Sequence, residues 1–90
     1  MGYATGASRA ATGSITANED STLTLAAPSA QVMISNDSAV PAYVRLNGAV
    51  SSTVYDFVLA AGDRAYVEDV VVATVHVYMN ATSGLRVACW

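Results

Sequence analysis

Hydrophobic residues recur at every second position in several short stretches of this chain, mostly in its last two-thirds. A period of two is typical of a β-strand with one buried face. Turn-forming residues lie between the stretches, for example at 36–38 and 80–84. No stretch shows the period of a helix. The alternating hydrophobic positions are Val32 and Ile34; Val44 and Leu46; Tyr55, Phe57 and Leu59; Val75, Val77 and Met79; and Leu85, Val87 and Cys89.

This pattern predicts an all-β fold, a compact antiparallel β-sandwich of about seven or eight strands with jelly-roll-like connectivity. The break at Ala26–Ser29, which contains Pro28, is expected to end the first strand. Residues 54–60 and 64–68, joined by Ala61-Gly62-Asp63, are expected to pair as a hairpin. The expected strands cover residues 22–25, 30–36, 42–47, 54–60, 64–68, 70–79 and 85–90.

The first 20 residues differ from the rest of the chain. Residues 1–13 are mostly Gly, Ala, Ser and Thr with a single charge at Arg9, and they follow no period. One interpretation is a disordered leader, and the other is an extended arm that becomes ordered against a neighbouring subunit. The predicted organisation is therefore a flexible or extended N-terminal arm at residues 1–20 and a β-sandwich domain at residues 21–90.

The residues between the buried positions should face water in a monomer, yet many are aromatic or arginine. These residue types dominate the binding energy of protein interfaces, so we expect a subunit or shell interface. Two alternatives stay open: the side chains form part of the core or its rim, or the aromatic rings form a platform for sugars. Asp56 is expected to pair with Arg45 or Arg86 across strands or subunits. The expected interface set, including the charge of the arm, is Arg9, Tyr43, Arg45, Asp56, His76, Tyr78, Arg86 and Trp90.

The composition also favours a covered surface. Hydrophobic residues make up 53% of the chain and charged residues only 12%, and all four basic residues are arginines. Lysine commonly protects exposed strand edges, whereas arginine is favoured in interfaces. The net charge of −3 argues against a nucleic-acid partner, and no hydrophobic run is long enough to indicate a membrane partner. The N-terminal residues lack the order of a signal peptide, so synthesis in a cytoplasm without export is expected.

Residues able to carry out chemistry are few and scattered. His76 is the only histidine and Cys89 the only other soft ligand candidate, so a structural role for His76 is favoured over a metal site or a general base. Cys89 alternates with hydrophobic residues, which predicts a buried side chain rather than a catalytic thiol. Asp63, Glu68 and Asp69 lie at predicted turns and form no calcium-binding pattern. We therefore expect no enzyme activity, no metal and no cofactor.

Four segments carry a recognisable order of strands: one ending in Ser-Asn, a Val-Arg-Leu strand, a Phe-x-Leu strand leading to a glycine turn, and a hydrophobic strand ending in Trp. They are Val32–Asn36, Ala42–Gly48, Asp56–Asp63 and Leu85–Trp90. This order resembles small β-sandwich structural proteins of tailed bacteriophages, which include capsid cement (decoration) proteins and small tail or baseplate components. The resemblance covers about residues 22–90, and Ala61 stands where such patterns often have a proline.

The resemblance implies a virion structural protein of the capsid cement type, made in the cytoplasm of a host bacterium and placed on the capsid surface. Its implied partners are copies of itself, as a homotrimer, and the major capsid protein or another virion protein. The arm would reach neighbouring subunits, and binding only to the assembled shell would stabilise it by mass action. An alternative from a different class is a carbohydrate- or receptor-binding β-module of a phage tail or fibre.

Overall fold

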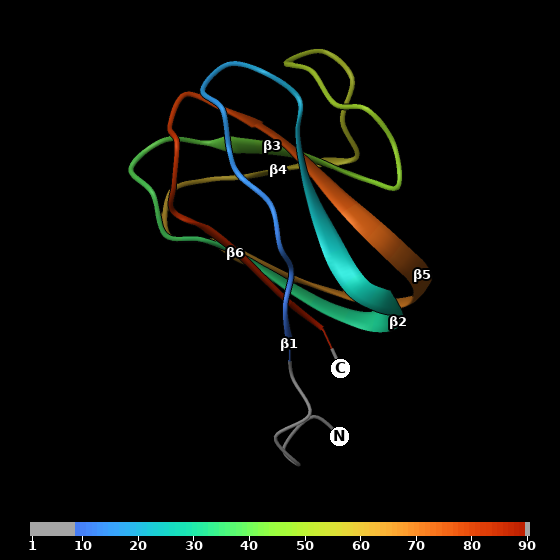
Figure 1. Cartoon of the computed structure of the whole chain (residues 1–90). Coiled ribbons are helices and arrows are strands. Elements are labelled where there is room, and N and C mark those ends of the chain that lie inside the picture. The colour runs from blue at the N-terminus through green and yellow to red at the C-terminus, as the bar shows by residue number, and fades with distance from the viewer. Residues whose placement is uncertain (1–8, 90) are drawn as a thin grey trace.

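The computed structural model describes residues 9–89 of the chain, and strands, turns and loops make up this part without a helix (Figure 1). The prediction of an all-β fold is therefore confirmed. The strands are β1 (Arg9–Ala10), β2 (Ser21–Asn36), β3 (Ala42–Leu46), β4 (Phe57–Leu59), β5 (Arg64–Met79) and β6 (Leu85–Cys89).

The strands form one antiparallel sheet in the order β1-β6-β2-β5-β3-β4. Because β1 has only two residues, the five longer strands make up the body of the sheet. The 16-residue strands β2 and β5 pair along most of their length, from Ser21 opposite Val77 to Ser35 opposite Arg64. The predicted sandwich of seven or eight separate strands is thus wrong, because each long strand runs through a position where the sequence suggested a break.

Bends rather than ends mark those two positions. In β2 the register with β5 shifts between Thr24 and Ser29, a stretch that contains Pro28, and again between Ser29 and Gln31. In β5, Asp69 has a left-handed backbone with φ of 64°. Such irregularities let a strand change direction while its pairing continues. The gaps between the strands expected at 22–25 and 30–36, and at 64–68 and 70–79, therefore fall within continuous strands.

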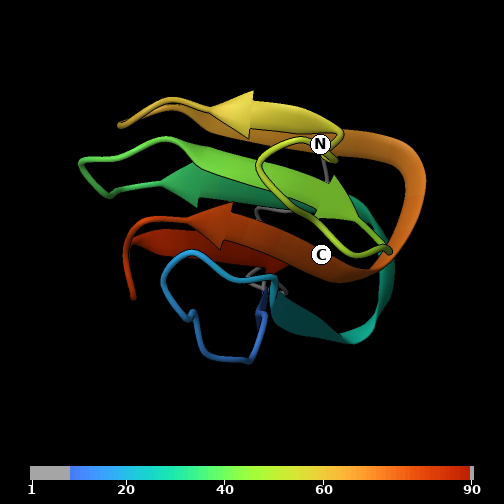
Figure 2. The same ribbon diagram turned by 90° about the horizontal axis from the view of Figure 1, so that it is seen from above.

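The bends fold the sheet over itself, so the two halves of each long strand have different neighbours (Figure 2). The first half of β2 pairs with the second half of β5, which in turn pairs with β3. The second half of β2 lies between β6 and the first half of β5. The core lies between these two layers; its buried residues include Leu23, Val32, Ile34, Val44, Val75, Val77, Met79, Val87 and Cys89.

The predicted hairpin between residues 54–60 and 64–68 is wrong. β4 pairs with β3, with Ala42 opposite Leu59, and not with β5. The turn after β4 instead carries the chain to the far layer. There the Asn36 N–H donates to the Asp63 carbonyl and the Gly62 N–H donates to the Asn36 carbonyl, both at 2.8 Å. Alternation showed which side chains face inward but not which strand each one pairs with.

The described part of the predicted arm, residues 9–20, lies on the domain's own sheet. β1 pairs with the end of β6, and the Thr12 N–H then donates to the Thr24 carbonyl of β2 at 2.9 Å. The Asn18 N–H donates to the Met79 carbonyl at 2.9 Å, and Ile15 packs against the core. In this part the segment closes one side of the folded sheet. The arm expected from residues 1–8 lies outside the described residues and stays a prediction.

Candidate functional site

Three tyrosines gather on the outer surface of β3 and β5. Val44 and Val77 point into the core, so the neighbouring residues Tyr43 and Tyr78 face outward, opposite each other in register. The ring centroid of Tyr43 lies 6.3 Å from that of Tyr78 and 5.1 Å from that of Tyr55, with the rings tilted. These are the distances and angles that aromatic pairs prefer.

Val58 of β4 lies opposite Tyr43 on its other side and extends this surface to the edge of the sheet. Tyr55 and Val58 are 44% and 42% exposed. We call Tyr43, Tyr55, Val58 and Tyr78 the tyrosine face. The prediction that Tyr43 and Tyr78 occupy outward-facing strand positions is confirmed, and both side chains are half-buried there. The expectation that Tyr55 is buried is wrong, because β4 begins only at Phe57 and Tyr55 belongs to the preceding loop.

Asp56 fixes the position of Tyr55 on this face. Its N–H donates to the Val44 carbonyl at 2.8 Å, and its Oδ2 accepts from the Leu46 N–H at 2.9 Å. Both bonds hold the loop against β3. The expected pairing of Asp56 with Arg45 or Arg86 is not formed: the ion pairs among the described residues are His76–Asp20 and Arg86–Asp37.

Arg45 lies opposite His76 in register but folds back over the turn after β3. Its Nη1 donates to the Ala49 carbonyl at 2.9 Å, and an added Cβ at Gly48 would come within 3.3 Å of its Cζ. The side chain therefore stabilises this turn. Arg45 belongs to the same outer surface as the tyrosine face, but its guanidinium bonds within the domain, to Ala49.

His76 lies next to Tyr78 on β5 and has hydrogen-bond partners at both ring nitrogens. Nδ1 lies 3.0 Å from Asp20 Oδ1 and 3.3 Å from Thr22 Oγ1, and Nε2 lies 3.1 Å from Thr74 Oγ1. The side chain is only 15% exposed. A ring satisfied in this way connects the segment before β2 to β5, which fits a structural role. No sequence pattern could link Asp20 to His76, because the two residues lie 56 positions apart.

Arg86 and Asp37 form a separate polar cluster near the end of β2. Arg86 Nε donates to Asp37 Oδ2 at 2.6 Å, and the Ser35 hydroxyl donates to Asp37 Oδ1 at 2.9 Å. The Ser35 hydrogen bond, followed by the one from Arg86, holds the pKa of Asp37 below its ordinary value. Arg86 lies on β6, in the other layer from the tyrosine face. The side chain of Arg9 and all of Trp90 lie outside the described residues.

This cluster gives a testable pKa prediction. Ser35→Ala should raise the pKa of Asp37 toward its unfolded value, and Arg86→Gln, which removes a charged hydrogen-bond donor, should raise it as well. A carboxyl whose pKa is lowered by folding stabilises the fold above its unfolded pKa and loses that contribution as the pH falls through the folded value. Both variants should therefore lose less stability on acidification than the wild type does. A carboxyl NMR titration of Asp37 measures the shift, and an unchanged pKa in Ser35→Ala would contradict this assignment.

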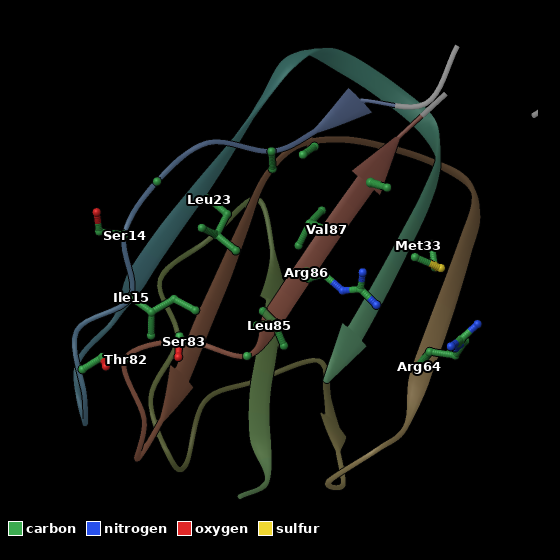
Figure 3. A pocket seen from close by; sticks show the side chains of 15 residues that line it. Ser14, Ile15, Leu23, Met33, Arg64, Thr82, Ser83, Leu85, Arg86 and Val87 are labelled. Carbon is green, nitrogen blue, oxygen red and sulfur yellow. The ribbon is translucent and has the colours of Figure 1, made fainter. Parts of the chain in front are cut away.

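An open hollow of about 710 Å³ lies beside β6, where the N-terminal segment leaves that strand (Figure 3). Ile15 and Leu23 line it on one side of β6, and Met33 and Arg64 on the other. Its lining residues include two arginines and no carboxylate. Sequence patterns could not reveal this hollow, because its walls come from segments far apart in the chain.

Within residues 9–89, no group of three or more His, Cys, Asp or Glu side chains lies close enough together to bind a metal ion. Cys89 is buried and unpaired with another cysteine, and its predicted burial is confirmed. Within the same range no helix is long and hydrophobic enough to cross a membrane. Comparison with protein-family models, with curated proteins and with solved structures finds no match to this chain.

Proposed function

We propose that this protein is a structural component of a virion, a cement-type β-domain that attaches to an assembled shell. The observation that carries this proposal is the tyrosine face. Aromatic side chains there are held in a fixed arrangement by β3, β5 and the Asp56 bonds; Tyr55 is 44% exposed, and Tyr43 and Tyr78 are half-buried. Tyrosines held rigidly at a surface lose little conformational entropy on binding, so they suit a protein-binding surface.

The shape of the surface supports the same proposal. Tyr43, Val58 and Tyr78 occupy outward-facing strand positions and do not line the hollow beside β6, whereas small-molecule substrates are usually bound in concave pockets. The four segments that carry the resemblance to phage structural proteins fall on β2, β3, β4 with its following turn, and β6. They form the body of the domain, so they support a shared scaffold rather than a shared catalytic site.

We further propose that the folded sheet is a jelly-roll-like form in which two bent strands each supply a strand to both layers. One layer would hold β1, β6, the second half of β2 and the first half of β5. The other would hold the first half of β2, the second half of β5, β3 and β4. The pairing registers support this description, because the neighbours of β2 and β5 change at their bends.

Particle association tests the function. Phage particles from a strain that encodes this chain are purified on a density gradient, and their proteins are quantified by mass spectrometry. A cement protein should be present in a copy number comparable with that of the major shell protein. Its presence in the cell lysate combined with its absence from the particles would contradict the proposal. The expected placement on the capsid surface would show as removal of the protein by mild dissociation that leaves the shell intact.

A carbohydrate-binding module is the second candidate, and the tilted tyrosines beside hydrogen-bonding groups favour it. The hydroxyl of Thr22, which is exposed and lies opposite His76 in register, could also bond a sugar hydroxyl. Binding to a glycan array that is lost in Tyr43→Ala and Tyr78→Ala, but kept in Tyr66→Ala outside this face, would support the module. Particle binding lost in the same two variants, without any glycan signal, would support the cement function.

A further inference from the structure

One edge of β5 has no strand partner among residues 9–89. The first half of this strand pairs with β2 on one side, with Met33 opposite Tyr66. On its other side β3 pairs only with the second half, from Val75 to Met79. Residues 64–68 therefore form an open edge, and Tyr66 on it is 63% exposed. An exposed edge with a large apolar side chain is a template for another strand.

The hydrogen-bond pattern shows which main-chain groups face this open edge. The Asn36 N–H donates to the Asp63 carbonyl, one step beyond the pair of Ser35 and Arg64. In an antiparallel ladder such directly bonded pairs alternate with unbonded ones. The N–H and C=O groups of Ala65 and Val67 therefore face β2. Those of Arg64, Tyr66 and Glu68 point outward.

We propose that this edge binds the same edge of a second copy of the chain, antiparallel and centred on Tyr66. Tyr66 then lies opposite Tyr66 of the other copy, and Arg64 of each copy lies opposite Glu68 of the other. Opposite charges directly across an antiparallel pair are favourable, and here the two-fold symmetry forms the pair twice. The edge is complementary to itself in charge.

The register centred on Tyr66 pairs the largest number of outward-facing main-chain N–H and C=O groups. It pairs every free N–H and C=O of Arg64, Tyr66 and Glu68 with the other copy. A centre at Ala65 or Val67 would leave the groups of one of the three residues unpaired and would bring no arginine opposite a carboxylate. The left-handed backbone of Asp69 turns the chain out of line after Glu68, which limits the contact to this short segment.

This inference goes beyond the proposed function and does not depend on it. The contact uses a different edge from the tyrosine face, so both surfaces can be occupied together. A two-fold contact produces dimers, whereas the resemblance to phage proteins predicts a trimer. Measuring the mass in solution therefore distinguishes the two.

Charge reversal is the sharpest test of the register. Arg64→Glu and Glu68→Arg each place like charges opposite one another at two positions, so each should weaken the dimer about tenfold or more. The double variant Arg64→Glu/Glu68→Arg restores both pairs with reversed polarity and should recover dimerisation. Tyr66→Pro removes an N–H that faces the open edge, so it should weaken the dimer without breaking the ladder to β2. Tyr78→Ala, on the other surface, should dimerise like the wild type.

Light scattering coupled to size-exclusion chromatography measures the mass over a range of concentrations. The measured mass of the wild type should rise with concentration from the 9.3 kDa of one chain to twice that value. Far-ultraviolet circular dichroism at the lowest concentration shows whether each variant keeps its fold. A wild type that stays monomeric, or that forms a trimer, would overturn the inference. So would two single reversals that dimerise like the wild type, or a double variant that stays as weak as the singles.

Discussion

Replacing Asn36 by alanine should lower the free energy of unfolding by about 3 kcal/mol or more, because it leaves several buried polar groups without partners. Asn36 has no exposed surface. Its Nδ2 donates to the carbonyls of Val40 at 2.8 Å and Leu59 at 2.9 Å, and its Oδ1 accepts from the Ser38 hydroxyl at 2.6 Å. One side chain thus joins the end of β2 to the turns after β2 and β4.

Urea denaturation followed by circular dichroism measures this effect. Asn80→Ala is the matched control, because the Asn80 side chain is exposed and accepts a 3.2 Å bond from Asn18. That variant should change the free energy of unfolding by no more than about 0.5 kcal/mol. If the two alanine variants have the same midpoint, the buried amide does not hold these turns together.

Ile34→Ala should lower the free energy of unfolding by about 3 to 4 kcal/mol, the usual range for truncating a fully buried branched side chain. Ile34 is 0% exposed and lies in the second half of β2, opposite Ala65 of β5 and Val87 of β6. The cavity would open between the two layers of the folded sheet. The whole free energy of unfolding of a domain of this size is expected to be only about 5 to 10 kcal/mol. The variant should therefore be strongly destabilised at 37 °C.

Ile34→Val keeps this prediction measurable if the alanine variant fails to fold. It removes one methylene group and should cost about 1 kcal/mol. Val71→Ala is the control on the surface, because Val71 is 64% exposed, and it should be close to neutral. Thermal unfolding of the three variants should therefore rank them Ile34→Ala, Ile34→Val, Val71→Ala from least to most stable. Equal losses at Ile34 and Val71 would contradict the described core.

Strand positions with strict alternation were predictable from the sequence. Residues 30–36, 42–47 and 85–90 were expected as strands, and they lie within or close to β2, β3 and β6. Alternation works here because each of these segments has one side facing the core. The same pattern could not separate a bend from an end, since Pro28 and Asp69 disturb the period in either case.

Pairing partners were not predictable, because the period of a strand records its faces and not its neighbours. Phe57 and Leu59 alternate as expected, yet their strand pairs with β3 rather than with the strand that follows in sequence. Contacts between distant segments were equally hidden, as with Asp20 beside His76. Asn36 was expected only as the end of a strand and the start of a turn, although its amide reaches carbonyls more than 20 positions away.

The candidate site was predicted in part. Tyr43, Arg45, His76 and Tyr78 do share one outer surface, because they occupy outward positions on paired strands. Arg86 was expected with them but lies in the other layer. Tyr55 completes the tyrosine face from a loop, and no periodic pattern could place a loop residue. The position of the loop depends on the Asp56 bonds to β3, which are set by tertiary structure.

The tyrosine face and the open edge of β5 give the domain two distinct surfaces. One presents aromatic rings from β3, β5 and the loop before β4, and the other presents main-chain groups with complementary charges. A chain with so few charged residues has little else to keep such surfaces solvated. Both surfaces are therefore expected to be covered by protein in the working assembly.

Hydroxyl-radical footprinting of the tyrosines tests the central claim that the tyrosine face binds a larger assembly. Oxidation of Tyr43, Tyr55 and Tyr78 is measured by mass spectrometry in purified particles and in the protein released from them. Tyr55, which is 44% exposed in the single chain, should be oxidised several-fold more slowly in the particle. Equal oxidation of Tyr55 in the two states would show that this face stays open to solvent, and it would contradict the proposed attachment.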